Sequence, residues 1–184
     1  MRIIAGTHRG RLIAGPKGRE IRPMSDKARE AVFSILSTAV EDRPVLDLFA
    51  GTGAMGLEAL SRGARSVLFI DSNRRAVALI RTNLRALDLD GRSTVLVADV
   101  VRWWARRPEL PADPALAFLT PPYQDFERSP DRLLALIAGL QTALAAGSIL
   151  VVESRKDFDP RRLPDPDRWE IRRYGQAQIA IYDK

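Results

Sequence analysis

Residues 44 to 152 alternate short apolar runs with segments of helical periodicity, and this pattern restricts the fold more than any other feature of the chain. The apolar runs are predicted to be strands: 45–49, 67–70, 94–97, 116–119 and 148–152. The segments between them are predicted to be helices: 54–62, 74–87, 100–107 and 130–145. Strands that are joined by helical crossovers pair in parallel. We therefore expect an α/β fold built on a doubly wound, mostly parallel sheet.

The C-terminal part of the chain has a different pattern, in which apolar and polar residues alternate. This alternation covers 169–174 and 177–182, on either side of Gly175 and Gln176. Two alternating runs joined by a two-residue glycine turn are typical of a β-hairpin. We expect the sheet to end in an antiparallel pair of strands.

The N-terminal part of the chain precedes this alternation. Residues 2–14 are predicted to form two short strands around a glycine-containing turn. A helix is predicted to start after Ser25, its N-cap, with an apolar face made of Ala28, Val32, Ile35 and Leu36. Lys27 and Arg29 lie off that face and are expected to point outward. We expect residues 1–37 to be a small appendage packed on a main domain of residues 38–184.

Most of the chain's net charge of +6 lies in its first 37 residues. This segment contains eight Lys and Arg residues and three Asp and Glu residues, which gives +5 and leaves +1 for the other 147 residues. A one-sided basic segment suits a polyanion, because neutralised phosphates release condensed counterions. A solvated surface is the alternative explanation.

The sequence lacks cysteine and contains one histidine, His8. These two facts exclude thiol nucleophiles, zinc fingers and Ser-His-Asp triads, and we expect no metal site. No apolar run approaches the roughly 20 residues of a membrane span, and no secretory leader is recognisable. We expect a soluble, cytoplasmic monomer without a membrane partner, whose chemistry uses carboxylates, hydroxyls, backbone dipoles or a cofactor.

A glycine-rich turn, from Gly51 to Gly56, follows the first predicted strand of the alternating region. It has the pattern GxGxxG between a strand and a helix, where glycines let the backbone approach a nucleotide-like ligand. Asp71 ends the next strand, 20 residues after Gly51, where a carboxylate can accept hydrogen bonds from ribose hydroxyls. Asp99 ends the third strand and is suited to an adenine amino group. Tight strand-to-helix packing alone is the structural alternative.

Asp47, four residues before Gly51, indicates which adenosine cofactor is expected. NAD places its pyrophosphate at the glycine turn and the helix N-terminus, so a nearby carboxylate would be an unfavourable neighbour. S-adenosylmethionine has no phosphate and carries an amine and a sulfonium that are both cationic. Asp47 therefore favours the methyl donor.

The loop Thr120-Pro-Pro-Tyr123 follows the fourth strand, near the point where the order of a doubly wound sheet reverses and ligands bind. The two prolines fix the backbone, so the loop holds its carbonyl groups in place and presents Tyr123 rigidly. A flipped base can stack on this ring while its exocyclic amine donates to acceptors of the loop. A stiffened surface turn with a chance aromatic residue is the alternative.

Several segments together resemble the bacterial 16S ribosomal RNA guanine-N2 methyltransferase family, the RsmD-like proteins. They are Arg2–Gly6, Arg9–Arg11, Arg22–Phe33, Asp47–Ala64 and Pro121–Tyr123. The resemblance covers essentially the whole chain. Two N-terminal parts, Arg2–Gly6 with Arg9–Arg11 and Arg22–Phe33, are the most specific, because many amino-methyltransferases share the glycine turn and the Pro-Pro-Tyr loop.

This resemblance implies a seven-stranded class I methyltransferase fold with S-adenosylmethionine as the donor. It implies a guanine of 16S rRNA, in the 30S subunit or an assembly intermediate, as the acceptor. With the residue pattern, it gives these expected cofactor contacts: Asp47, Phe49, Gly51, Gly53, Asp71 and Asp99. The expected catalytic residues, which hold the target base and its amine, are Thr120, Pro121, Pro122 and Tyr123. The expected RNA contacts are Arg9, Arg11, Arg22, Lys27 and Arg29.

Thr120 departs from the family pattern, which has Asp or Asn before Pro-Pro-Tyr. In that pattern the side chain and the carbonyl of the first proline accept hydrogen bonds from the target amine, so that positioning and electrostatics dominate catalysis. Threonine keeps one acceptor oxygen but cannot be anionic. Loss of a charged acceptor would cost roughly 1.5–3 kcal/mol, or about ten- to hundredfold in rate.

Three alternatives to a guanine-N2 methyltransferase stay open at this point. An RNA-binding or assembly protein would keep the cofactor and have weakened or lost turnover because of Thr120. An adenine-N6 nucleic-acid methyltransferase would share the Pro-Pro-Tyr loop but would need a larger target-recognition region than 184 residues allow. A nicotinamide oxidoreductase is disfavoured by Asp47.

Overall fold

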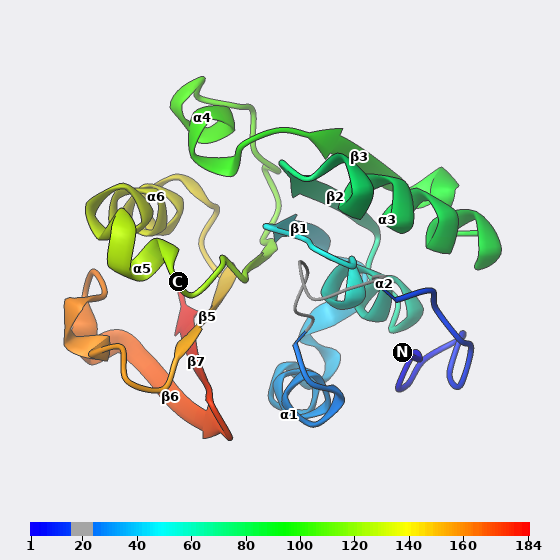
Figure 1. Ribbon diagram of the computed structural model, residues 1–184, viewed down its shortest axis with the longest axis horizontal. Coiled ribbons are helices and arrows are strands. Elements are labelled where there is room, and N and C mark those ends of the chain that lie inside the picture. The colour runs from blue at the N-terminus through cyan, green and yellow to red at the C-terminus, as the bar shows by residue number, and fades with distance from the viewer. Residues whose placement is uncertain (16–23) are drawn as a thin grey trace.

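The structure, a computed structural model, describes residues 1–15 and 24–184. It is a mixed sheet with helices on both faces (Figure 1). Arg22, one of the expected RNA contacts, lies outside the described residues. Among the described helices, none is both long enough and apolar enough to cross a membrane.

Seven strands form one sheet in the order β3-β2-β1-β4-β5-β7-β6. Their bounds are β1 (Pro44–Leu48), β2 (Ser66–Asp71), β3 (Ser93–Val97), β4 (Leu116–Leu119), β5 (Ile149–Arg155), β6 (Trp169–Tyr174) and β7 (Ala177–Asp183). Strands β1 to β5 pair in parallel, whereas β7 is antiparallel to both of its neighbours, β5 and β6. The predicted parallel sheet and its C-terminal antiparallel hairpin are confirmed.

The α-helices are α1 (Asp26–Leu36), α2 (Ala54–Ser61), α3 (Arg74–Ala86), α4 (Val100–Ala105), α5 (Asp125–Arg128) and α6 (Pro130–Ala143). Short 3-10 segments cover Ser37–Val40, Asp90–Arg92, Pro160–Arg162 and Pro166–Arg168. Helix α5 was not predicted, because four residues are too few to show helical periodicity. It lies directly after the Pro-Pro-Tyr loop.

The core has two parts, one on each face of the sheet. Helices α1, α2 and α3 cover one face, and α4, α5 and α6 cover the other (Figure 1). Strand β1 contributes side chains to both parts of the core. Val45 belongs to the hydrophobic cluster on the first face, and Leu46 and Leu48 belong to the cluster on the second face. Because neighbouring side chains of a strand point to opposite faces, a strand buried on both sides is mostly apolar, and in β1 the buried Asp47 is the exception.

The N-terminal segment packs against the first of these clusters, which contains Ile3 and Ile13. Instead of the two predicted strands, it forms one antiparallel bridge between Arg2 and Leu12. The turn is closed by a hydrogen bond from the Gly10 amide to the Ile3 carbonyl at 2.9 Å. The predicted N-cap of α1 is present, since the Ser25 hydroxyl accepts from the Ala28 amide at 3.2 Å.

The prediction that Arg29 points outward is wrong. Its side chain is 1% exposed, and Nη2 donates to the Arg2 carbonyl at 2.8 Å and to the Asp26 carboxylate at 3.1 Å. Position 35, assigned to the apolar face, is 38% exposed, and Phe33 is buried in its place. The buried stripe of α1 therefore includes positions 29 and 33, one helical turn apart. Lys27 is exposed, as expected.

Candidate active site

A cavity of about 520 Å³ opens at the carboxyl ends of strands β1 to β5. Its volume lies in the range of small-molecule sites, and it includes the point between β1 and β4 where the strand order reverses. The described residues that line it are Phe49, Gly51, Asp71, Ser72, Asn73, Asp99, Val100, Thr120, Pro121, Pro122, Tyr123, Gln124, Asp125 and Glu153. The cavity thus brings the glycine turn and the Pro-Pro-Tyr loop to one place.

The glycine turn presents its backbone to one end of the cavity. Phe49 has a positive φ of 63°, a left-handed conformation that costs a non-glycine residue about 1–3 kcal/mol. Gly51 follows with a φ of 55°, and its amide donates to the Asp71 carboxylate at 2.7 Å. The other oxygen of Asp71 accepts from the Asn73 amide at 2.8 Å. Two backbone amides therefore fix this carboxylate at the cavity wall.

The later glycines of the turn serve packing rather than the cavity wall. Gly53 is buried, and neither it nor Gly56 lines the cavity. A Cβ atom at Gly56 would lie 2.2 Å from the ring of Phe69 on β2, so only glycine lets α2 approach the sheet this closely. The structural alternative therefore accounts for the third glycine of the motif.

Asp47 lies beneath the glycine turn and does not line the cavity. One carboxylate oxygen accepts from the Gly56 amide at 2.9 Å, and the other, Oδ1, has no hydrogen-bond partner among the described residues. Burial raises the pKa of Asp47 to about 7; the Gly56 hydrogen bond opposes this rise, and the charge of Asp71 adds to it. The Asp47 carboxylate is thus held against the backbone of the glycine turn, and its charge lies beneath the cavity.

Two further aspartates lie on the wall beyond Asp71. Asp99 is exposed, and its Oδ1 caps α4 by accepting from the Arg102 amide at 2.8 Å. Partial burial raises the pKa of Asp125; Arg128 opposes this rise and Asp99 contributes to it. These side chains make the same wall of the cavity acidic.

The Pro-Pro-Tyr loop forms the other end of the cavity. The Thr120 hydroxyl donates to the Phe49 carbonyl at 3.2 Å, so its proton is engaged and its oxygen acts as an acceptor toward any other partner. Pro121 is buried beside it, and Pro122 is exposed. The Tyr123 hydroxyl donates to Glu153 Oε1 at 2.7 Å, which ties the loop to β5.

Sequence reasoning missed Glu153 and Asp125, although both line the cavity. Glu153 directly follows the apolar run that predicted the fifth strand, at the edge of the sheet where the other strands carry Asp71 and Asp99. That position was the available signal. Asp125 lies in the unpredicted helix α5, and no sequence pattern marked it.

Four carboxylates and no Lys or Arg line the cavity among the described residues. A field of this sign favours a cationic ligand and disfavours a pyrophosphate. No group of three or more His, Asp or Glu side chains in residues 1–15 and 24–184 is placed to hold a metal ion.

None of the expected RNA contacts within residues 1–15 and 24–184 lines the cavity. Arg9 and Arg11 are exposed on the N-terminal turn. Arg11 Nη2 contacts the Ala86 carbonyl at 3.1 Å, so this turn sits at the C-terminal end of α3, whereas Asn73 at the N-terminal end lines the cavity. Arg29 is buried and does not face a polyanion in this structure.

Comparison with known proteins shows to which family this chain belongs. A family model described as "Conserved hypothetical protein 95", which represents the RsmD family, matches residues 1–183. The chain belongs to this family. The resemblance seen in the sequence is thereby confirmed, and the strand order is that of class I S-adenosylmethionine-dependent methyltransferases.

Individual relatives match over nearly the whole chain. YlbH of Bacillus subtilis is 32% identical over 184 residues, which cover 100% of this chain and 99% of that protein. Ribosomal RNA small subunit methyltransferase D of Haemophilus influenzae is 27% identical over 182 residues, covering 99% and 91%. A solved structure of Escherichia coli YhhF is 28% identical with a TM-score of 0.80, covering 100% of this chain and 97% of the other.

Proposed function

We propose that this protein uses S-adenosylmethionine to methylate the exocyclic N2 amine of a guanine in 16S rRNA. The observation that carries the proposal is the single acidic cavity that joins the glycine turn to the Pro-Pro-Tyr loop. The name of the Haemophilus relative supports a small-subunit rRNA substrate, either in the 30S subunit or in an assembly intermediate. Such a substrate places the protein in the cytoplasm.

The residues at the glycine turn suit this cofactor. When bound, S-adenosylmethionine supplies an electrophilic methyl group on a cationic sulfur. A backbone amide holds Asp71 at the cavity wall, where its carboxylate can accept hydrogen bonds from ribose hydroxyls, and Asp99 on the same wall suits an adenine amine. The carboxylates of the cavity attract this cation. They would repel the pyrophosphate of a nicotinamide cofactor, which is anionic. The nicotinamide alternative is therefore disfavoured by the whole cavity and not by Asp47 alone.

The loop residues suit an amine that must be oriented. In the proposed complex the Thr120 oxygen and the Pro121 carbonyl accept hydrogen bonds from the target NH2, which aligns the nitrogen lone pair with the methyl group. Tyr123 is fixed by its hydrogen bond to Glu153, so its ring can serve as a stacking surface for the flipped base. Orientation and electrostatics supply most of the rate enhancement in this scheme.

A methyl-transfer assay tests the proposal. Purified protein is incubated with methyl-labelled S-adenosylmethionine and under-methylated 30S subunits or naked 16S rRNA, and the digested RNA is analysed by mass spectrometry. The expected product is N2-methylguanosine at one position. Labelled N6-methyladenosine would favour the adenine-methylating alternative, and cofactor binding without any incorporation would favour the assembly-protein alternative.

The Thr120→Asp variant is expected to methylate about tenfold faster, because a charged acceptor strengthens the hydrogen bond to the amine. Thr120→Val has nearly the same shape without the acceptor oxygen and is expected to be slower than the natural enzyme. Single-turnover rates at saturating cofactor measure both effects. Equal rates for all three proteins would show that position 120 does not contact the amine.

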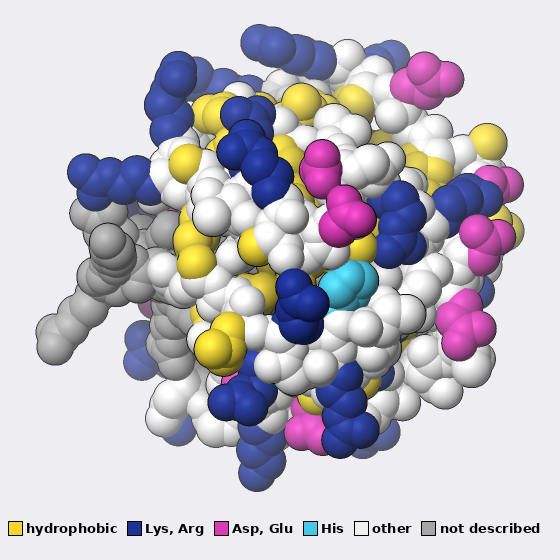
Figure 2. Space-filling model, turned by 90° about the vertical axis from the view of Figure 1, so that its right-hand side faces the viewer, with side chains coloured by type: hydrophobic (Ala, Val, Ile, Leu, Met, Phe, Trp, Pro, Cys, Tyr) yellow, Lys and Arg dark blue, Asp and Glu magenta, His cyan; other side chains and the backbone are white. Residues whose placement is uncertain are grey.

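The proposed RNA surface extends beyond the N-terminal turn along α3. This helix carries four arginines and no acidic residue. Arg74, Arg81 and Arg85 are seven and four residues apart, so they lie on one face of the helix, and all three are exposed. Together with Arg9 and Arg11 they form a basic row from the turn to Asn73 at the cavity. Figure 2 shows Lys and Arg side chains over this side of the molecule.

The Arg74→Ala/Arg85→Ala double variant is expected to bind RNA more weakly and with less dependence on salt. Log K falls as log[salt] rises, and each lost phosphate contact makes this slope shallower by about 0.7–0.9. Binding is measured by fluorescence anisotropy at several salt concentrations. The matched control is Arg132→Ala, an exposed arginine of α6 on the opposite face of the sheet. An unchanged slope in the double variant would exclude α3 from the RNA surface.

A further inference from the structure

A buried carboxylate lies at the end of the cavity that we assign to the target base. Glu153 extends from β5, is 8% exposed, and lines the cavity together with Thr120, Pro121 and Tyr123. Its Oε1 accepts from the Tyr123 hydroxyl at 2.7 Å. Burial of a carboxylate costs free energy that an apolar side chain at the same strand position would not cost. The chain nevertheless ends an apolar run, Leu150 to Val152, with glutamate.

The hydrogen-bonding pattern of guanine fits such a carboxylate. On its Watson-Crick edge guanine presents two adjacent donors, N1–H and one N2–H, which point in the same direction. A carboxylate has two oxygens and accepts both. Adenine presents an unprotonated N1 next to its amine, so the same carboxylate would face a lone pair. A flipped base is read along this edge.

We propose that Glu153 selects guanine by accepting hydrogen bonds from N1–H and from the N2–H on the N1 side. This inference rests on the proposed function and names the base that the site takes. The second N2–H, on the N3 side, is left for the loop after β4, where the Thr120 oxygen and the Pro121 carbonyl share it in a three-centre hydrogen bond. The two ends of the target amine are thus held by different elements, β5 and the loop after β4.

Tyr123 has a positioning role in this arrangement. Its hydroxyl donates to Glu153 Oε1 and restrains the glutamate rotamer, while each carboxylate oxygen can accept more than one hydrogen bond. The carboxylate also compensates for the uncharged residue at position 120, because it places a negative charge beside the amine that gains positive charge during methyl transfer.

The test compares guanine with 2-aminopurine at the methylated position. 2-Aminopurine keeps the 2-amine but has an unprotonated N1. The substituted 16S rRNA is assembled by ligation once the position has been mapped, and kcat/KM is measured for both bases. The natural enzyme is expected to prefer guanine by about a hundredfold or more, because a site built to accept N1–H rejects a base without it. Comparable kcat/KM values for the two bases would overturn the proposal without any variant.

The Glu153→Gln variant reverses one of the two hydrogen bonds. Its amide can donate to N1 of 2-aminopurine and accepts only one hydrogen bond from guanine. We expect kcat/KM for guanine to fall about ten- to hundredfold and the preference for guanine to shrink by at least as much. Glu127→Gln, an exposed glutamate of α5 outside the cavity wall, is the matched control and should keep both values. Tyr123→Phe is expected to lower kcat/KM less and to keep the preference.

The possible outcomes separate this proposal from the proposed function. If the natural enzyme methylates no RNA, the proposed function fails and this inference fails with it. If it methylates guanine but Glu153→Gln keeps the full preference over 2-aminopurine, only the role of Glu153 is overturned. Thermal melting and cofactor binding of Glu153→Gln show that a lost preference is not the result of unfolding.

Discussion

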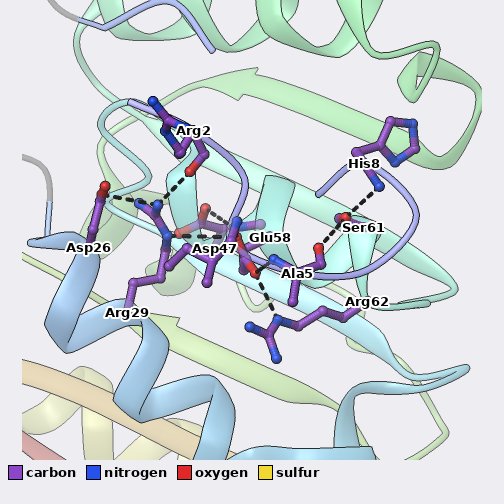
Figure 3. A network of polar contacts seen from close by, with 11 residues as sticks. Arg2, Ala5, His8, Asp26, Arg29, Asp47, Glu58, Ser61 and Arg62 are labelled. Atoms are coloured by element: carbon purple, nitrogen blue, oxygen red, sulfur yellow. Dashed lines mark hydrogen bonds and ion pairs between the residues drawn. The ribbon is translucent and has the colours of Figure 1, made fainter. Parts of the chain in front are cut away.

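Replacement of Glu58 by alanine is expected to lower the free energy of unfolding by about 3–5 kcal/mol, the range for breaking a buried ion pair on one side. The Glu58 side chain is fully buried on α2. It accepts from the amides of Ile4 and Ala5 at 2.8 and 3.0 Å and from Arg62 Nε at 2.8 Å. Arg29 Nε lies 3.8 Å from its other oxygen (Figure 3). One carboxylate thus joins the N-terminal segment, α1 and α2.

The physical reason for this large effect is the buried guanidinium that would remain. Arg29 Nε and Nη1 have no hydrogen-bond partner among the described residues. The nearby carboxylate of Glu58 is therefore the main group that compensates the positive charge of Arg29 in the interior. Asp26, its other ionic partner, is largely exposed. Without Glu58, an uncompensated charge and two unpaired backbone amides would stay in the interior.

Urea denaturation measures the free energy of unfolding of Glu58→Ala and of the control Glu30→Ala, which changes an exposed glutamate. The value for the control should lie within about 0.5 kcal/mol of that of the natural protein. Amide hydrogen exchange at Ile4 and Ala5 should accelerate in the first variant alone. A loss below about 1 kcal/mol would contradict the network as drawn. The Arg29→Met substitution should lower the free energy of unfolding less in the Glu58→Met variant than in the natural protein, because the two charges are coupled.

The main elements of the fold were predictable because each depends on residues close together in the sequence. The apolar runs, the helical periodicity between them and the Ser25 cap are local patterns, and the parallel sheet follows from their order. The pairing of Arg29 with Glu58 could not be predicted in this way. It joins residues 29 positions apart in two different helices, and a charged residue on an amphipathic helix is ordinarily exposed.

The candidate site was predictable where function is carried by strand ends and glycine turns. Asp71, Asp99 and the loop from Thr120 to Tyr123 line one cavity because the carboxyl ends of parallel strands meet at one edge. Glu153 was missed because the predicted strand stopped one residue before it. The depth of Asp47 was also unpredictable, since burial of a polar side chain depends on how α2 packs over the strand.

The Asp47→Asn variant is expected to be more stable than the natural protein, by an amount that grows with pH. Burial raises the pKa of Asp47 from 3.8 to about 7 in the folded protein. Below about pH 4 the carboxyl is protonated in both states. Between pH 4 and 7 it ionises in the unfolded chain first, so the folded state loses relative stability. Above pH 7 the deficit is complete and amounts to roughly 4 kcal/mol.

Thermal or urea unfolding at a series of pH values measures this difference. Asparagine can still accept from the Gly56 amide and does not titrate, so the two proteins should be about equally stable at pH 4 and should differ most near pH 8. Asp88→Asn, at an exposed position, is the matched control and should show no such growth. A difference that stays constant from pH 4 to 8 would show that Asp47 is ionised in the folded protein throughout.

Cofactor binding should change this titration in a direction that depends on the ligand's charge. The charge of Asp71, at the cavity wall, contributes to the raised pKa of Asp47. A cationic ligand beside Asp71 offsets that charge and lowers the pKa, so binding releases protons and tightens from pH 6 to pH 8. An anionic dinucleotide would take up protons and bind more weakly over the same interval. Calorimetry in buffers of different ionisation enthalpy shows whether protons are released or taken up on binding. The Asp47→Asn variant should abolish the proton release. The charge of the preferred cofactor is thus reported by one buried carboxyl.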